Sequence, residues 1–246
     1  MTSPRTKLKP LAQEVDETEH FPEETVKKMQ KLGFMGIPVP KEYGGQGCDP
    51  LTYAMCVEEL SKVCGTTGVI VSAHTSLCCD PIQTFGTEEQ KQKYLVPLAK
   101  GEKLGAFGLT EPGAGTDAQG QQTKAVLDGD EWVLNGSKVF ITNGKEADIY
   151  VIIAVTGVVE VKGRKKKGDL CIYRRERNSG LHLRYQREED GYPWICYIRA
   201  DLHRLPYPER EPAWPEGQRF PHRYAYPGWR TYRYRFPGTW SCRGRS

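Results

Sequence analysis

Several residue types stop at one point in this chain of 246 residues. No lysine, valine or methionine follows Lys167, whereas only Arg5 and Arg164 precede Gly168 among the arginines. The segment 168–246 is instead rich in arginine and proline, and it holds every tryptophan except Trp132. Because one folded domain rarely changes its residue usage so abruptly, we expect residues before and after this border to differ in origin.

Other absences exclude several classes of protein. No run approaches the ~18 apolar residues of a membrane span, and the N-terminal residues lack the apolar core of a signal peptide. We therefore expect a cytoplasmic protein with no membrane span. The eight cysteines show no Cys-X-X-Cys spacing, and the five histidines are scattered, so we expect free thiols and no metal site. A net charge of +4, balanced before Gly168, does not indicate nucleic-acid binding.

The first hundred residues have the apolar periodicity of helices. The second helix should begin at Pro22, with acidic residues in its first turn, and end at Gly33. A loop rich in glycine and proline should follow over 35–49. The predicted helices cover residues 7–19, 22–32, 50–64, 65–76 and 88–98.

From about residue 104 the pattern changes to alternating and continuous apolar runs, which predicts strands. We expect turns at Asp128–Asp130 and at Asn135–Gly136. The Asn-Gly step predicts a two-residue hairpin between the apolar segments on either side of it.

Two segments carry the chemistry. Residues 107–117 read FGLTEPGAGTD and residues 140–144 read FITNG. The glycines leave backbone N–H groups open to an anion, Asp117 can cap the next turn of the chain, and the hydroxyls of Thr110 and Thr142 can bond a heterocycle. Without further context, a glycine-rich loop is a weak signal.

The strings GLTEPGAGTDAQG and WVLNGSKVFITNG resemble the acyl-CoA dehydrogenase family of flavoenzymes, and the resemblance covers about residues 7–167. It implies an α+β fold class: a helical N-terminal domain over 1–102 without its first helix, then an incomplete β-barrel middle domain over 104–167. We expect the C-terminal helical-bundle domain of the family to be missing from this chain. We expect residues after about 168 to be irregular or disordered.

The resemblance also implies a function. Family members oxidise the Cα–Cβ bond of an acyl-CoA thioester with FAD. The overall sequence of this chain resembles the short-chain, butyryl-type members. Electrons pass to an electron-transferring flavoprotein, and the intact enzyme is a homotetramer. Thr116 is implied to contact both the FAD pyrophosphate and the acyl-CoA substrate. The implied FAD-binding residues are Phe107, Leu109, Thr110, Gly115, Thr116, Phe140 and Thr142.

No catalytic residue is assigned, because the family's catalytic base lies beyond the matched part of the chain. Glu111 is interpreted as structural, and Glu58–Glu59 as a solvated helix face. Alternatives remain open: an acyl-CoA oxidase-like or other flavoenzyme of the superfamily, or a non-functional product. We expect weak or no FAD retention and no dehydrogenase turnover from this chain.

The segment 168–246 is interpreted as a tail read out of frame. Permitted codons from Gly168 onward, read one base later, spell ISAFIVEKGTPGF, and those for Thr231–Arg245 spell RIGIASQALGLAEGA. Both strings resemble the part of the family's sequence that follows the matched segment. One inserted base near Lys165–Gly168 would explain the border. The competing interpretation is a basic, aromatic RNA-binding tail.

Overall fold

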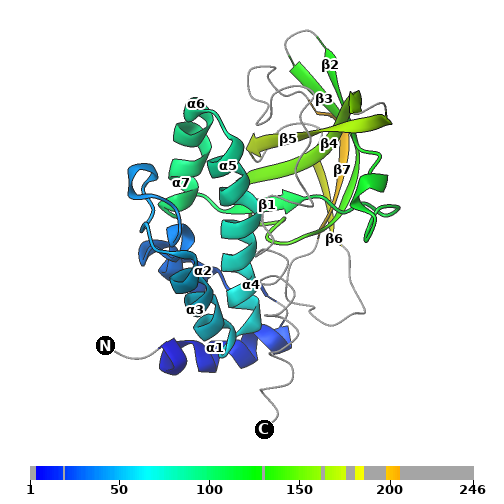
Figure 1. The fold of residues 1–246 in the computed structure, drawn as a ribbon. Helices are drawn as coiled ribbons and strands as arrows, with labels where there is room; N and C mark the ends of the chain where they lie inside the picture. The colour runs from blue at the N-terminus through cyan, green and yellow to red at the C-terminus, as the bar shows by residue number, and fades with distance from the viewer. Residues whose placement is uncertain are drawn as a thin grey trace.

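A computed structural model describes residues 4–18, 20–128, 131–161, 164–175, 181–185 and 198–205. Helices come first along the chain and a curled sheet follows, with the helices gathered on one side of the sheet (Figure 1). This confirms the predicted order of a helical region and a β-rich region. No helix in the described ranges is long and apolar enough to cross a membrane.

The predicted helices are present, and local signals set their ends. Asp49 caps α3 by accepting from the Thr52 backbone N–H at 2.7 Å, and Gly33 takes a left-handed φ of 78° after α2, as a glycine after a helix end commonly does. The α- and π-helical elements are α1 (Pro4–Thr18), α2 (Glu23–Lys31), α3 (Pro50–Ser61), α4 (Gly65–Ala73), η3 (His74–Cys79), α5 (Asp80–Phe85), α6 (Glu88–Gln90), η4 (Lys91–Leu95) and α7 (Val96–Ala99), and three short 3-10 turns are η1 (Phe34–Gly36), η2 (Lys41–Tyr43) and η5 (Ala118–Gly120).

Two of these elements are π-helical turns, and each precedes a proline. Pro81 follows η3, and Pro97 lies shortly after η4. Proline lacks an N–H and clashes with the carbonyl of the preceding turn. A local π turn accommodates that defect without ending the helix. The chain therefore runs as nearly continuous helix over 65–85, next to the sheet (Figure 1).

The described strands form one sheet, in the order β1-β4-β2-β3-β7-β6, with β5 paired to β4. β1 runs parallel to β4, whereas β2 and β3 form an antiparallel pair in which Asp128 lies opposite Glu131. The strands are β1 (Gly105–Gly108), β2 (Lys124–Asp128), β3 (Glu131–Ile141), β4 (Ile149–Val161), β5 (Arg164–Arg175), β6 (Leu181–Tyr185) and β7 (Ile198–Leu205).

The predicted hairpin at Asn135–Gly136 is wrong. β3 runs without a turn from Glu131 to Ile141, and the β2–β3 pairing puts the connection after Asp128, at the other predicted turn. Gly136 instead lies at an irregularity in the pairing with β7. A Cβ there would lie 2.4 Å from Thr123 Oγ1, so the glycine allows close packing rather than reversing the chain.

The expectation of irregular structure after about 168 is wrong for three described ranges. β5 crosses the border as a continuous strand, and β6 and β7 lie beyond it. The alternation of apolar and polar residues in Ile198–Leu205 suits a strand, and the backbone groups of β4 and β3 need partners. The rest of the segment 168–246 lies outside the described residues.

The core joins the two regions. One buried cluster combines the 78–99 helices with β1 and β4, and a second lies among α2, α3 and α4. β4 is the centre of the first cluster, because every side chain from Ile149 to Ala154 is buried. A strand covered on both faces reads as a continuous apolar run, which is how IYVIIA reads in the sequence.

Candidate functional site

The segment TEPGAGTD forms a tight turn directly after β1. The backbone groups of Glu111 and Ala114 bond each other in both directions, at 3.0 and 3.3 Å. A Cβ added at Gly113 or Gly115 would meet no heavy atom within 4 Å. The outer side of this turn is therefore open, which leaves room for a bulky anion beside the backbone.

A buried ion pair supports the base of the turn. Lys138 of β3 is fully buried, and its Nζ donates to Glu111 Oε1 at 2.7 Å and to the Leu109 carbonyl at 2.9 Å. It also donates to Gln121 Oε1 at 3.2 Å. One ammonium group thus holds the strand before the turn, the turn itself and the segment after it.

Glu111 has all the partners it needs in that network. Its carboxylate also accepts from the backbone N–H groups of Gln122 at 2.6 Å and Thr123 at 2.9 Å. Burial alone would raise the pKa of Glu111, but the bonds from Lys138, Thr123 and Gln122 outweigh burial and hold that pKa below its ordinary value. A carboxylate so engaged is a poor proton acceptor, which supports its interpretation as structural.

The second segment, FITNG, has an unusual backbone. Phe140 at the end of β3 has a φ of 57° and Asn143 has a φ of 63°. A left-handed φ is strained for a bulky residue such as phenylalanine. Phe140 is 45% exposed, so it is not the core residue that a strand phenylalanine is by default. The strained backbone turns its ring outward, where a ligand can contact it.

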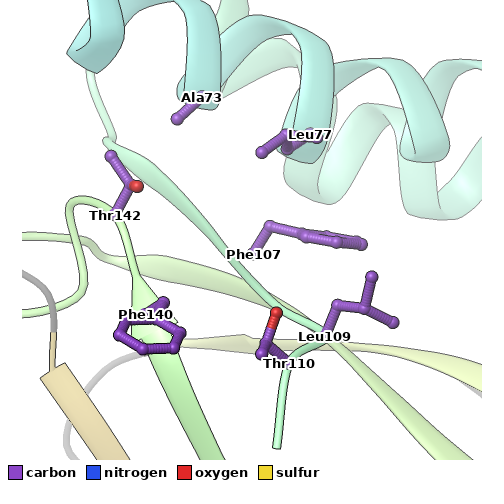
Figure 2. A pocket seen from close by; sticks show the side chains of 7 residues that line it. All are labelled: Ala73, Leu77, Phe107, Leu109, Thr110, Phe140 and Thr142. Atoms are coloured by element: carbon purple, nitrogen blue, oxygen red, sulfur yellow. The ribbon is translucent and has the colours of Figure 1, made fainter. Parts of the chain in front are cut away.

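These segments meet at one small pocket of about 40 Å³, lined by Ala73, Leu77, Phe107, Leu109, Thr110, Phe140 and Thr142. Figure 2 shows two side chains approaching from the helix and the others from the strands and the segments that follow them. This volume is far below the ~300–1,000 Å³ of a typical ligand pocket. The chain therefore supplies a wall for a larger ligand rather than an enclosed cavity.

The structure brings five of the predicted FAD-binding residues to that pocket: Phe107, Leu109, Thr110, Phe140 and Thr142. Gly115 and Thr116 lie instead on the exposed turn after Thr110, outside the lining. Ala73 and Leu77 also line the pocket, and neither belongs to the two sequence motifs. Nothing in the sequence of the buried helix distinguishes them from other core positions.

The helix beside the pocket also carries a buried histidine. His74 Nδ1 accepts from the Gly105 backbone N–H at 2.9 Å, and its Nε2 lies 3.4 Å from Cys79 Sγ. Complete burial lowers the pKa of His74 to about 4, so the ring is neutral at neutral pH. Its role is to join the helix to β1.

Comparisons with known proteins show which family the chain resembles. The family model "Acyl-CoA dehydrogenase, N-terminal domain" matches residues 4–102, and "Acyl-CoA dehydrogenase, middle domain" matches residues 106–201. The second match extends past Lys167. A curated relative, the short-chain specific acyl-CoA dehydrogenase of Clostridium acetobutylicum, is 68% identical over 158 residues, which are 64% of this chain and 41% of the relative.

Two solved structures show the same fold. One, described as an electron transferring flavoprotein of Acidaminococcus fermentans, aligns with a TM-score of 0.77 and 41% identity, over 89% of this chain and 60% of that chain. The other is a glutaryl-CoA dehydrogenase from Mycobacterium smegmatis in complex with FADH2, with a TM-score of 0.77 and 29% identity, over 85% and 52%. The chain thus spans little more than half of these structures.

Proposed function

Since the chain belongs to the acyl-CoA dehydrogenase family, we propose that it carries part of the FAD site of an enzyme that oxidises the Cα–Cβ bond of a short-chain acyl-CoA. The observation that carries the proposal is the convergence of five implied FAD-binding residues on one pocket, beside an open glycine turn.

The residues present fit FAD by their chemistry. Phe107, Leu109 and Phe140 offer an apolar and aromatic surface for a planar ring system, and the hydroxyls of Thr110 and Thr142 face the same pocket (Figure 2). When bound, FAD supplies the hydride acceptor for the reaction. The protein's own contribution is to present this surface and to fix the turn through the Glu111–Lys138 pair.

The open turn is the proposed place for the pyrophosphate. Gly115 and Thr116 lie on its exposed side, where backbone N–H groups can donate to an anion without obstruction from a Cβ. We assign Thr116 a second contact, with the CoA arm of the substrate. No carboxylate is assigned as catalytic base, because both oxygens of Glu111 are already engaged.

The substrate class and partners rest on relatives. The short-chain assignment follows the name of the Clostridium relative, and an electron-transferring flavoprotein as partner follows the description of the Acidaminococcus structure. We propose a homotetramer and a cytoplasmic location on the basis of the family resemblance and the composition. The sedimentation coefficient of the purified chain tests the oligomeric state.

Titration of the purified chain with FAD tests the proposed function. We expect quenching of flavin fluorescence that saturates only at high FAD, because the pocket of about 40 Å³ forms one wall of a site. The variant Phe140→Ala should weaken that binding further. Absence of any saturable quenching would contradict the proposal. Bleaching of the visible flavin band by butyryl-CoA would instead contradict our expectation that this chain has no dehydrogenase turnover.

A further inference from the structure

The side chain of Asn143 links the elements around the pocket. It lies in the turn between β3 and β4, and its Nδ2 donates to the backbone carbonyl of Ile70 in α4 and to that of Gly105 in β1, each at 3.2 Å. These bonds join positions 73 and 38 residues away along the chain. The side chain is buried, so water does not compete for them.

Each of the three joined elements contributes to the pocket lining. α4 and the following π turn provide Ala73 and Leu77, and β1 provides Phe107. The end of β3 and its turn provide Phe140 and Thr142. Figure 2 shows these side chains facing one another across the space between helix and strands.

The backbone of the turn places Asn143 for this task. Asparagine tolerates its φ of 63° better than most residues, and its carbonyl accepts from the N–H groups of Glu146 and Ala147. The side-chain orientation follows from its partners, because a flipped amide would point its oxygen at two carbonyls. Within the described part of the chain, Oδ1 has no hydrogen-bond partner. The amide donors are thus the groups in use.

We infer that Asn143 is the positioning residue of the pocket: its amide holds α4 and β1 at a fixed spacing from the β3–β4 turn, and so sets the width between the helix side and the strand side. The inference deepens the proposed function, because the pocket it sets is the proposed flavin wall. The hydrogen bonds of Asn143 are present in the chain without ligand, so their role can be tested without FAD.

Two variants separate the amide from the backbone. Asn143→Gly accepts the left-handed φ without strain but removes both donors. Asn143→Asp keeps the shape of the side chain and tolerates that φ, but it offers acceptors where donors are needed. If only the backbone conformation matters, the glycine variant should behave as the parent chain does.

Amide hydrogen exchange of the ligand-free chain, followed by mass spectrometry, tests the coupling. Both variants should exchange about tenfold faster in three segments at once, 68–77, 104–108 and 138–147. The hydrogen bonds of the Asn143 amide hold these segments together, so all three should open more often when the bonds are lost. Asn135→Gly on the exposed side of β3 is the control and should leave 68–77 and 104–108 unchanged.

Several results would overturn the inference. Faster exchange confined to 138–147 would show that Asn143 stabilises only its own turn. Loss of protection throughout the chain in both variants would make it a general stability element instead. FAD titration of the same variants is a separate readout: if the parent chain binds no FAD, the proposed function fails, while the exchange result still decides the role of Asn143.

Discussion

At the scale of single residues, Glu111 and Lys138 form a buried ion pair at the base of the turn after β1. Lys138 is 0% exposed and Glu111 is 6% exposed, and burying charges costs several kcal/mol per ion unless each is fully bonded. Here the ammonium has three acceptors and the carboxylate has three donors. These hydrogen bonds offset the large desolvation cost of the pair and hold the turn rigid.

Removing the ammonium group should be costly. We predict that Lys138→Met lowers the free energy of unfolding by about 3–5 kcal/mol, because the carboxylate of Glu111 stays buried without its counter-charge. Urea denaturation followed by circular dichroism measures the change. Lys124→Met is the matched control, since Lys124 is exposed on the neighbouring strand β2, and it should change stability by less than about 0.5 kcal/mol. Equal effects of the two substitutions would refute the prediction.

His74 should make stability depend on pH in a defined window. Burial lowers the pKa of His74 from 6.5 to about 4, so between these values the unfolded chain binds a proton that the folded chain does not. The free energy of unfolding should therefore decrease as the pH falls from 6.5 to 4, by up to about 3 kcal/mol from this group. Above pH 6.5 the histidine is neutral in both states and contributes no slope.

The variant His74→Gln tests that assignment. It should show a shallower loss of stability between pH 6.5 and 4 than the parent chain, whatever its stability at neutral pH. Urea denaturation at half-unit pH intervals measures the slope, and His20→Gln, at an exposed position, controls for loss of a histidine. Parallel curves for His74→Gln and the parent would assign the pH dependence to other groups.

At the scale of elements, β3 shows where local signals stop being sufficient. An Asn-Gly step within an apolar run is a strong hairpin signal, yet Asn135 and Gly136 lie within an uninterrupted strand. Because its pairing with β2 begins at Glu131, opposite Asp128, β3 is long enough to reach both the Glu111 network and the pocket. Tertiary contacts with Thr123 then use the glycine for close packing.

Gly136 should not tolerate a side chain. A Cβ at this position would lie 2.4 Å from Thr123 Oγ1 and 2.7 Å from Thr123 Cα, so backbone as well as side chain must move. We predict that Gly136→Ala costs about 1–3 kcal/mol, measured by urea denaturation. Gly65→Ala at the start of α4, where an added Cβ meets nothing within 4 Å, should be neutral or slightly stabilising. A neutral Gly136→Ala would contradict the close-packing role of this glycine.

At the scale of the whole molecule, the border at Lys167 does not coincide with a break in the sheet. β5 spans it, and its residues Gly168 and Arg175 pair with Gly157 and Ile149 of β4. The middle-domain match also continues to residue 201. The change of residue usage is nevertheless abrupt, and an origin in a shifted reading frame remains our proposal for the segment 168–246.

Resequencing of the gene across codons 160–170 tests that proposal. We predict a run of A bases followed by G bases at Lys165–Gly168, and downstream DNA that encodes ISAFIVEK in the neighbouring frame. Removing one base from that run should yield a longer chain that retains FAD more strongly. DNA that cannot encode this string in the next frame would end the proposal and favour the basic-tail interpretation.

Much of the fold was predictable because its signals are local. Helix ends followed caps and glycines, such as Asp49 and Gly33, and the change to strands near residue 104 followed the change of period. The strands after 168 were not predicted, since the arginines and prolines around them obscure a short alternating pattern. Their formation depends on the unpaired edges of β4 and β3, which a sequence window does not contain.

The sequence by itself determined the two motif segments at 107–117 and 140–144, the helical and β-rich regions, and the family to which the chain belongs. Only the tertiary structure decided which side chains share the pocket, why Phe140 faces outward, and how Lys138 and Asn143 hold the site together. The physical reason is distance along the chain. Caps and periods act within a few residues, whereas the hydrogen bonds of Glu111, Lys138 and Asn143 that shape the site join residues 11 to 73 positions apart.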